Sequence, residues 1–387
     1  MSNPSKVMVF VGTRKGGFIF SGDTRRREWQ VSDPQFKGWN VMHMRLDPRD
    51  GRLHAAVVHP VYGPTTHYSD DFGETWTQAR LVPAFPRPSK SGRPLGTPDE
   101  AIQAADDEAA VRADPEKVLK VWHIEPGRPS ESGVLYAGIE PAALFRSADR
   151  GESWELVEGL YDHPQRPNWF PGGGGLCLHT ILLDPSDRER MYVAISAAGC
   201  YRTDDGGVTW RPQNKNVRAD FMPDKFPEFG QCVHKMALHP SQPQVIYQQN
   251  HCGVYRSDNA AEEWIDIGEG RLPSRFGFPI AVHPHDPATI YIALEESDEN
   301  RVSIEGRFAV WRSRDGGGSW QRLSDGLPQR AHLLALREAM ATDTLEQAGI
   351  YVGTSTGQVF HSRDAGDHWD VLADYLPPVL SVEAAVI

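Results

Sequence analysis

Residues 201–210 read Tyr-Arg-Thr-Asp-Asp-Gly-Gly-Val-Thr-Trp, and similar stretches recur along the whole chain. Five further copies that end in Trp occupy residues 68–76, 145–154, 255–264, 311–320 and 360–369, and a degraded copy occupies residues 20–29. Most of the intervals between these Trp residues are about 50 residues, a typical length for a propeller blade. The sequence therefore predicts one repeat architecture rather than several unrelated domains.

The repeated stretch has the chemistry of a tight hairpin turn. An Asp such as Asp205 can accept hydrogen bonds from backbone N–H groups of the turn, and a Gly such as Gly207 supplies a positive φ. The Trp that follows opens the next strand and buries a large ring between neighbouring sheets. In the copy at 255–264, Asn259 and Ala261 replace the Asp and the Gly, so we expect a looser turn there.

The shared form Ser/Thr-x-Asp-x-Gly-x-Thr/Ser-Trp resembles the Asp-box, or bacterial neuraminidase repeat, and its copies cover nearly the whole chain. This resemblance implies an all-β, seven-bladed β-propeller with four strands in each blade, formed by residues 1–387 as one domain. The first blade lacks an innermost strand at the N-terminus, and residues 378–387 can supply it. We expect the ring to close in this way, because closure removes exposed strand edges.

Net charge, hydropathy and the number of cysteines limit the partners and the cellular location that we expect for this protein. The formal net charge is −12, which argues against a nucleic-acid partner and against binding to an anionic membrane surface. The sequence has no apolar run long enough for a spanning helix. A strand-like pattern begins at Val7 and leaves no room for a signal peptide, and four Cys are too few for a disulfide scaffold. The sequence predicts a cytoplasmic protein without a membrane partner.

Long insertions are expected on one face of the ring. The loops that lead from the fourth strand of one blade to the first strand of the next are long, as is one loop between second and third strands: 80–117, 156–175, 211–230, 266–277 and 295–307. All fall on the face opposite the Asp-box turns, which we call the loop face. Long loops gathered on a rigid scaffold indicate function. Segment 80–117 is predicted to form a lid with a short acidic helix.

Histidines on the predicted innermost strands suggest a metal site. His43, His123, His179 and His234 each lie on such a strand, and innermost strands converge on the central channel. Imidazole suits Zn, Mn, Fe or Cu, so these four residues are the candidate ligands of a divalent transition metal. No nucleotide cofactor is expected, because the glycine run 172–175 lacks the strand-to-helix context of a phosphate loop.

Other polar and aromatic residues of the loop face complete the candidate site. The candidate catalytic residues are Glu140, His251, Glu295 and Arg14, chosen as acid–base groups and as an anion clamp. The candidate substrate-binding residues are His59, Trp169, Phe229, Arg330 and His332. These residues favour a small-molecule or saccharide-like substrate. The sequence leaves the oligomeric state open.

The Asp-box resemblance also implies sialidase activity, which needs an arginine triad, a Tyr–Glu pair and an Arg-Ile-Pro signature. None is evident here, so an exo-sialidase is not expected. We expect a hydrolase or lyase with a His-lined, metal-dependent pocket that acts on a small polar or anionic substrate. Two alternatives stay open. One is a glycoside hydrolase that pairs Glu140 with Glu295 or Glu296, and the other is a non-catalytic binding or assembly propeller.

Overall fold

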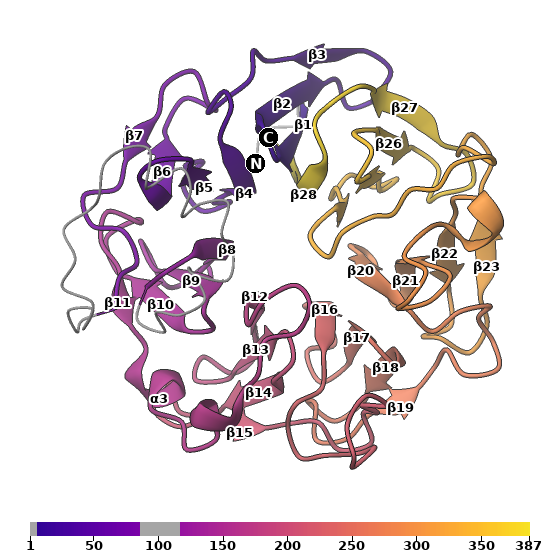
Figure 1. The fold of residues 1–387 in the computed structure, drawn as a ribbon. Helices are drawn as coiled ribbons and strands as arrows, with labels where there is room; N and C mark the ends of the chain where they lie inside the picture. The colour runs from indigo at the N-terminus through magenta and orange to yellow at the C-terminus, as the bar shows by residue number, and fades with distance from the viewer. Residues whose placement is uncertain (1–5, 86–116) are drawn as a thin grey trace.

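A computed structural model describes residues 6–85 and 117–387, and these residues form seven four-stranded antiparallel sheets arranged in a ring (Figure 1). In the first three sheets, from the channel outward, the strands are β28 (Val379–Val386), β1 (Val7–Thr13), β2 (Gly16–Gly22) and β3 (Trp29–Val31); β4 (Asn40–Leu46), β5 (Leu53–His59), β6 (Gly63–Ser69) and β7 (Thr77–Gln78); and β8 (Lys120–Pro126), β9 (Leu135–Glu140), β10 (Leu144–Ser147) and β11 (Glu155–Leu156). The predicted all-β, seven-bladed propeller is confirmed.

The other four blades follow in chain order around the ring. Their strands are β12 (Leu178–Leu183), β13 (Met191–Ile195), β14 (Gly199–Thr203) and β15 (Arg211–Pro212); β16 (Val233–Leu238), β17 (Ile246–Asn250), β18 (Gly253–Ser257) and β19 (Ile265–Asp266); β20 (Gly277–His283), β21 (Asp286–Leu294), β22 (Val310–Ser313) and β23 (Gln321–Leu323); and β24 (Met340–Thr342), β25 (Ile350–Gly353), β26 (Val359–Ser362) and β27 (Asp370–Ala373). Short helical turns α3 (Glu158–Tyr161), η1 (Arg166–Asn168) and η2 (Ile304–Gly306) lie in the connecting loops.

The two ends of the chain close the ring, as predicted. Strand β28 pairs with β1 in antiparallel register, with Val386 opposite Val7 and Val382 opposite Val11. The C-terminal strand thus becomes the innermost strand of the first blade (Figure 1). Val379 and Val382 are fully buried, so this strand also contributes to the core.

Each Asp-box turn is held by one repeated set of hydrogen bonds. In the second blade, Asp71 Oδ1 accepts from the backbone N–H of Thr75 at 2.9 Å, and Ser69 Oγ accepts from the N–H of Gly73 at 2.7 Å. The copy with Asn259 and Ala261 keeps both bonds, at 3.1 and 2.9 Å. The expected looser turn there is wrong, because the Asn carbonyl oxygen accepts the same backbone bond as a carboxylate.

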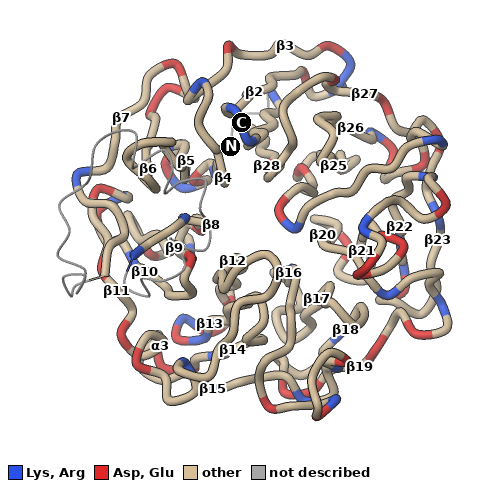
Figure 2. Tube along the Cα trace, in the orientation of Figure 1, with Lys and Arg blue, Asp and Glu red and all other residues tan. Residues whose placement is uncertain are grey.

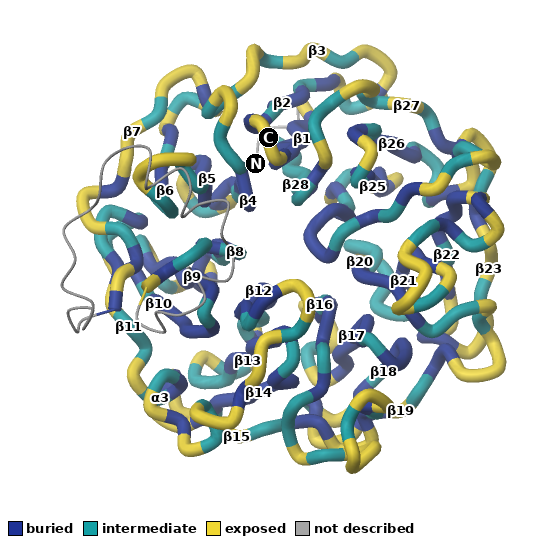
Figure 3. Tube along the Cα trace, in the orientation of Figure 1, coloured by how far each residue is buried: buried dark blue, intermediate teal, exposed yellow. Residues whose placement is uncertain are grey.

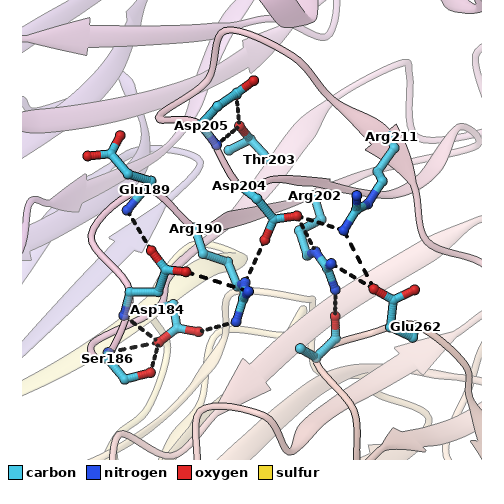
Figure 4. Close-up of polar contacts among 12 residues, drawn as sticks. Asp184, Ser186, Glu189, Arg190, Arg202, Thr203, Asp204, Asp205, Arg211 and Glu262 are labelled. Carbon is cyan, nitrogen blue, oxygen red and sulfur yellow. Dashed lines mark hydrogen bonds and ion pairs between the residues drawn. The ribbon is translucent and has the colours of Figure 1, made fainter.

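Arginines beside the Asp-box turns join neighbouring blades. Arg202 donates to the carbonyl of Ala260 at 2.6 Å and pairs with Glu262 at 2.7 Å, both in the next blade (Figure 4). Asp204 binds Arg190, Arg202 and Arg211 around the same point (Figure 4). Contacts between blades on this face are therefore polar and belong to the scaffold.

In each blade the inner strands are more buried than the fourth strand. The inner strands are mostly buried, whereas fourth strands such as β19 and the connecting loops are exposed (Figure 3). Lys, Arg, Asp and Glu are interspersed around the ring (Figure 2). None of the helices in the described ranges has the length and apolarity that crossing a bilayer requires. Most of the predicted lid, residues 86–116, lies outside the described residues.

Register shifts interrupt the innermost strands of six blades, among them the four successive blades that carry the predicted histidines. In β4 and β8 the unpaired extra residues are Met42 and Trp122, whereas in β12 and β16 they are His179 and His234. A bulge redirects the side chains beside it. The histidines therefore occupy two different strand positions: His43 and His123 follow the bulge, and His179 and His234 form it.

Candidate functional site

His123 and Lys235, which directly follow the bulges of β8 and β16, form a buried charge network with Glu338 near the centre of the ring. His123 Nε2 lies 3.2 Å from Glu125 and its Nδ1 lies 3.4 Å from Glu338. Glu338 is also bonded by Lys235 Nζ at 2.5 Å. Burial disfavours the charged form of His123, but the charge of Glu338 together with hydrogen bonds to Glu125 and Glu338 outweighs burial and raises the pKa of His123. The same partners hold the pKa of Glu338 well below its usual range, against the opposing effect of burial.

His43 belongs to the same network but is held neutral. Its Nδ1 accepts the backbone N–H of Ile124 at 3.2 Å, so its Nε2 carries the proton and donates to Glu383 at 3.1 Å. Burial, followed by the neighbouring charge of His123, lowers the pKa of His43. Arg45 bonds both Glu383 and Glu125. This network consists of paired charges inside the ring.

The four histidines predicted as ligands of one metal are divided by the structure. His43 and His123 are neighbours, with ring centroids 4.4 Å apart. His179 uses both nitrogens internally, on Thr180 Oγ1 at 3.0 Å and on the carbonyl of Val233 at 2.9 Å. His234 joins a different group, described next. The prediction of a single four-histidine centre is therefore corrected, because His179 and His234 form the bulge of their strands whereas His43 and His123 follow it.

The second group combines Cys232, His234 and His251 at the loop-face end of β16 and β17. The Cys232 Sγ and one ring nitrogen of each histidine all lie within 4.8 Å of one another. Burial opposes the thiolate of Cys232, but His234 and His251 outweigh it and lower the pKa of the thiol well below its usual range. His251 Nε2 lies 3.1 Å from Asp298 Oδ2. This group resembles both a metal site and a thiol–imidazole pair.

A cationic and aromatic wall lies beside this group. Arg337 Nη1 donates to Cys177 Sγ at 3.0 Å, and its guanidinium lies 5.2 Å from the Trp122 ring and 5.9 Å from the Phe278 ring. The Phe278 ring also stacks on His234, with centroids 4.4 Å apart. Residues of four blades and of the segment before β24 thus meet beside the Cys232 group.

The two candidate carboxylic acids have different environments. Glu140 accepts from Lys120 Nζ at 3.1 Å and from Trp122 Nε1 at 3.0 Å, so it sits in an ion pair. Glu295, directly after β21, is 2% exposed, and neither carboxyl oxygen has a hydrogen-bond partner among the described residues. Burial raises the pKa of Glu295 to about 8, although Arg301 opposes this rise. The two acids belong to different, non-adjacent blades, and Glu296 is exposed.

The remaining candidates lie apart from these groups or inside the scaffold. Trp169 is buried in the core and donates to Tyr201 Oη at 2.8 Å, so it packs the β11–β12 loop rather than offering a face to substrate. Phe229 packs against the same core cluster. His59 Nδ1 accepts the N–H groups of Val61 and Tyr62. The prediction for Trp169 is corrected to a structural role, because its buried ring fixes the long loop. The half-buried Phe229 and His59 stay predicted substrate-binding residues.

Three predicted residues are exposed on loops. Arg14 lies in the β1–β2 turn, where its backbone N–H donates to the carbonyl of Pro378 at 3.1 Å. Arg330 and His332 lie in the segment before β24. Both residues precede the innermost strand of the seventh blade, which is formed by 340–342.

The sequence did not reveal five residues that shape the two groups: Lys235, Asp298, Arg337, Glu338 and Glu383. Glu383 is the one acidic residue in the predicted closing segment 378–387, so its place in an innermost strand was a usable signal. Glu338 lies ahead of β24 and binds residues more than one hundred positions away, such as Lys235. No local pattern marks such a residue.

Comparisons with known proteins agree with the fold. Residues 67–78 match the BNR/Asp-box repeat. The xyloglucanase Xgh74A of Acetivibrio thermocellus is 23% identical over 210 residues, covering 50% of this chain and 22% of that protein. A probable oligoxyloglucan-reducing end-specific xyloglucanase of Neosartorya fischeri is 24% identical over 233 residues, covering 52% of this chain and 26% of that protein. The chain thus matches about a quarter of the length of these relatives.

Solved structures resemble the whole ring. The GH74 enzyme of Niastella koreensis superposes with a TM-score of 0.52 at 16% identity, over 97% of this chain and 55% of that one. A putative 6-phosphogluconolactonase of Bacteroides uniformis gives a TM-score of 0.53 at 10% identity, over 98% and 99% of the two chains. The repeat, the seven sheets and these superpositions agree: the chain is a seven-bladed β-propeller built on the Asp-box repeat.

Proposed function

We propose that this chain is a hydrolase that cleaves a glycosidic bond in a saccharide bound on the loop face, with Glu295 as the proton donor. The observation that carries the proposal is the carboxyl of Glu295. Glycoside hydrolysis requires a carboxylic acid that remains protonated near neutral pH and delivers its proton to the leaving oxygen. Burial raises the pKa of Glu295 to about 8.

The surroundings of Glu295 support this role. Its backbone N–H donates to the carbonyl of Phe276 at 3.0 Å, which fixes the end of β21 against the start of β20. Arg301 lies 5.3 Å from the Phe276 ring and 5.9 Å from the Phe278 ring. The Phe276 and Phe278 rings are 3% and 7% exposed, so they help to keep water from this region rather than offer a face to the saccharide.

The relatives also support the saccharide class, since the proteins that match about half of this chain are named xyloglucanases. The pairing of Glu140 with Glu295 or Glu296, which the sequence left open, is not part of this proposal. Glu140 lies in another blade and is bound to Lys120 and Trp122. Metal-dependent activity on a small anionic substrate stays a prediction.

The test uses Glu295→Gln, with Glu296→Gln as the matched control, because Glu296 is adjacent and exposed. Purified proteins are assayed for release of reducing ends from xyloglucan oligosaccharides and for hydrolysis of aryl glycosides. We expect kcat of Glu295→Gln to fall about 10²- to 10⁴-fold, the usual contribution of a general acid, while the control keeps wild-type activity.

The pH profile provides a second readout. A proton donor with a pKa of about 8 gives wild-type activity that falls as pH rises above that value. The proposal is overturned if the wild type turns over none of these saccharides. It is also overturned if Glu295→Gln retains full activity with the same alkaline limb.

A further inference from the structure

We propose that Cys232, His234 and His251 form a binding site for one divalent transition-metal ion, with zinc as the first candidate. The fourth coordination position would be open toward the loop face. The site is separate from Glu295 and does not depend on the saccharide proposal. Three Cys and His ligands with an open fourth position are the pattern of metal sites that act on a bound water or ligand.

The spacing of the ligand atoms fits such an ion. The Cys232 Sγ and one nitrogen of each histidine lie within 4.8 Å of one another. A tetrahedral zinc with Zn–S of about 2.3 Å and Zn–N of about 2.0–2.1 Å separates one sulfur and two nitrogen ligands by roughly 3.3–3.6 Å. Side-chain movements of about 1 Å would therefore close the group around an ion.

Both histidines are oriented by a partner on the second ring nitrogen. His234 Nδ1 donates to the carbonyl of Gly277 at 2.5 Å, and His251 Nε2 donates to Asp298 Oδ2 at 3.1 Å. These bonds leave Nε2 of His234 and Nδ1 of His251 for the ion. A metal-ligating histidine typically donates its other N–H to a backbone carbonyl or a carboxylate, and this group has one of each.

The backbone holds the three ligands in place before any ion binds. Cys232 directly precedes β16, and the N–H of His251 donates to the Cys232 carbonyl at 3.0 Å. His234 is the bulged residue of β16, so the bulge turns its ring toward the channel mouth beside Cys232. The ligands come from rigid strand ends, which position a site more accurately than flexible loops do.

The group of His43, His123 and Glu338 also has ligand atoms within 4.8 Å of one another, but it carries no such proposal. His43 uses both of its nitrogens, on Ile124 and Glu383, and Glu338 is bonded by Lys235. An ion there would have to displace these existing bonds. In the Cys232 group the bonds at the ligand atoms run between Cys232 and the two histidines, with Ser196 Oγ 3.7 Å from the sulfur, so an ion would replace contacts among its own ligands.

The same residues also match a thiol nucleophile, with His251 as its base and Asp298 as the group that orients the base. The experiment is therefore designed so that this outcome contradicts the metal proposal. The untagged full-length chain is stripped with a chelator, dialysed against zinc or cobalt, and analysed by mass spectrometry of the metal. We expect one equivalent per chain, and a thiolate-to-cobalt charge-transfer band in the near ultraviolet.

Variants assign the site. Cys232→Ser is expected to lose the charge-transfer band, and Asp298→Asn to weaken affinity about 10- to 100-fold, as loss of an outer-shell partner does. The matched control is Cys177→Ser, because Cys177 occupies the equivalent place before β12 and is also a free cysteine. The control should keep both the stoichiometry and the band. Circular dichroism verifies that each variant is folded.

Three results would overturn the proposal. One is binding of fewer than about 0.2 equivalents of zinc and of cobalt to folded protein at micromolar free metal, with ligands deprotonated at pH 7.5. The second is rapid alkylation of the Cys232 thiol by iodoacetamide that excess zinc does not slow. This result would assign the group as a nucleophile. A band that survives in Cys232→Ser but disappears in Cys177→Ser also contradicts the assignment.

Discussion

Replacing Glu295 with Gln is expected to stabilise the fold at neutral pH and to have little effect in acid. The pKa of this carboxyl is about 8 in the folded protein and ordinarily 4.5. Between these values the folded state keeps a proton that the unfolded chain releases. The free energy of unfolding of the wild type therefore falls as pH rises from 4.5 toward 8, and below pH 4.5 burial of this carboxyl causes no such loss. Gln is neutral throughout and avoids this loss.

The size of the effect follows from the same two values. Each pH unit inside the window is worth about 1.4 kcal/mol. The wild type therefore loses about 3 kcal/mol by pH 7 and less than about 1 kcal/mol by pH 5. Because the side chain is 2% exposed, solvent screening reduces this effect little. A variant that loses turnover while gaining stability would also be typical of an active-site residue.

Urea unfolding followed by Trp fluorescence at pH 5, 6, 7 and 8 measures the difference. With a denaturant slope of about 3 kcal/mol/M, the midpoint of Glu295→Gln should lie about 1 M above the wild type at pH 7. The two midpoints should nearly coincide at pH 5, and Glu296→Gln should follow the wild type at every pH. Equal stabilities at pH 7, or a shift independent of pH, would refute the reasoning.

Two further perturbations test the ring and the channel. Deletion of residues 379–387 removes β28 and exposes the edge of β1, so the truncated chain should lose its near-ultraviolet circular dichroism and cooperative unfolding; an unchanged urea midpoint would contradict ring closure. Glu338→Gln leaves Lys235 and His123 without their shared carboxylate and should cost about 3–5 kcal/mol, as loss of one partner from a buried pair does. The exposed Glu346→Gln is the control, and equal stabilities of the two variants would contradict the assigned network.

The fold was readable from sequence because the Asp-box is local. The turn depends on side chains such as Ser69 and Asp71 that bond backbone groups at most four residues away. Ring closure was also readable, since a first blade without an innermost strand requires one from the other end of the chain. The turn could be predicted because its hydrogen bonds lie within a short stretch of sequence. Ring closure could be predicted because counting the strands shows that one is missing.

The candidate site was only partly readable. His251 and Glu295 were found because they follow second strands on the expected face, and their polar character stands out there. The role of Cys232 was missed, because a small thiol in an inner strand usually packs as an apolar group. Trp169 was assigned to substrate, but large rings also fill the space under a long loop, and here the ring is buried.

The sequence by itself determined the repeat, the number of blades and the face on which long loops gather. Only the tertiary structure decided which ionisable groups meet. A single extra residue in an innermost strand moves His234 toward Cys232 and places Lys235 beside Glu338. Pairs such as His43 with Glu383 join residues 340 positions apart. A bulge shifts side-chain direction without a clear sequence signal, and contacts across the channel exist only once the ring has closed.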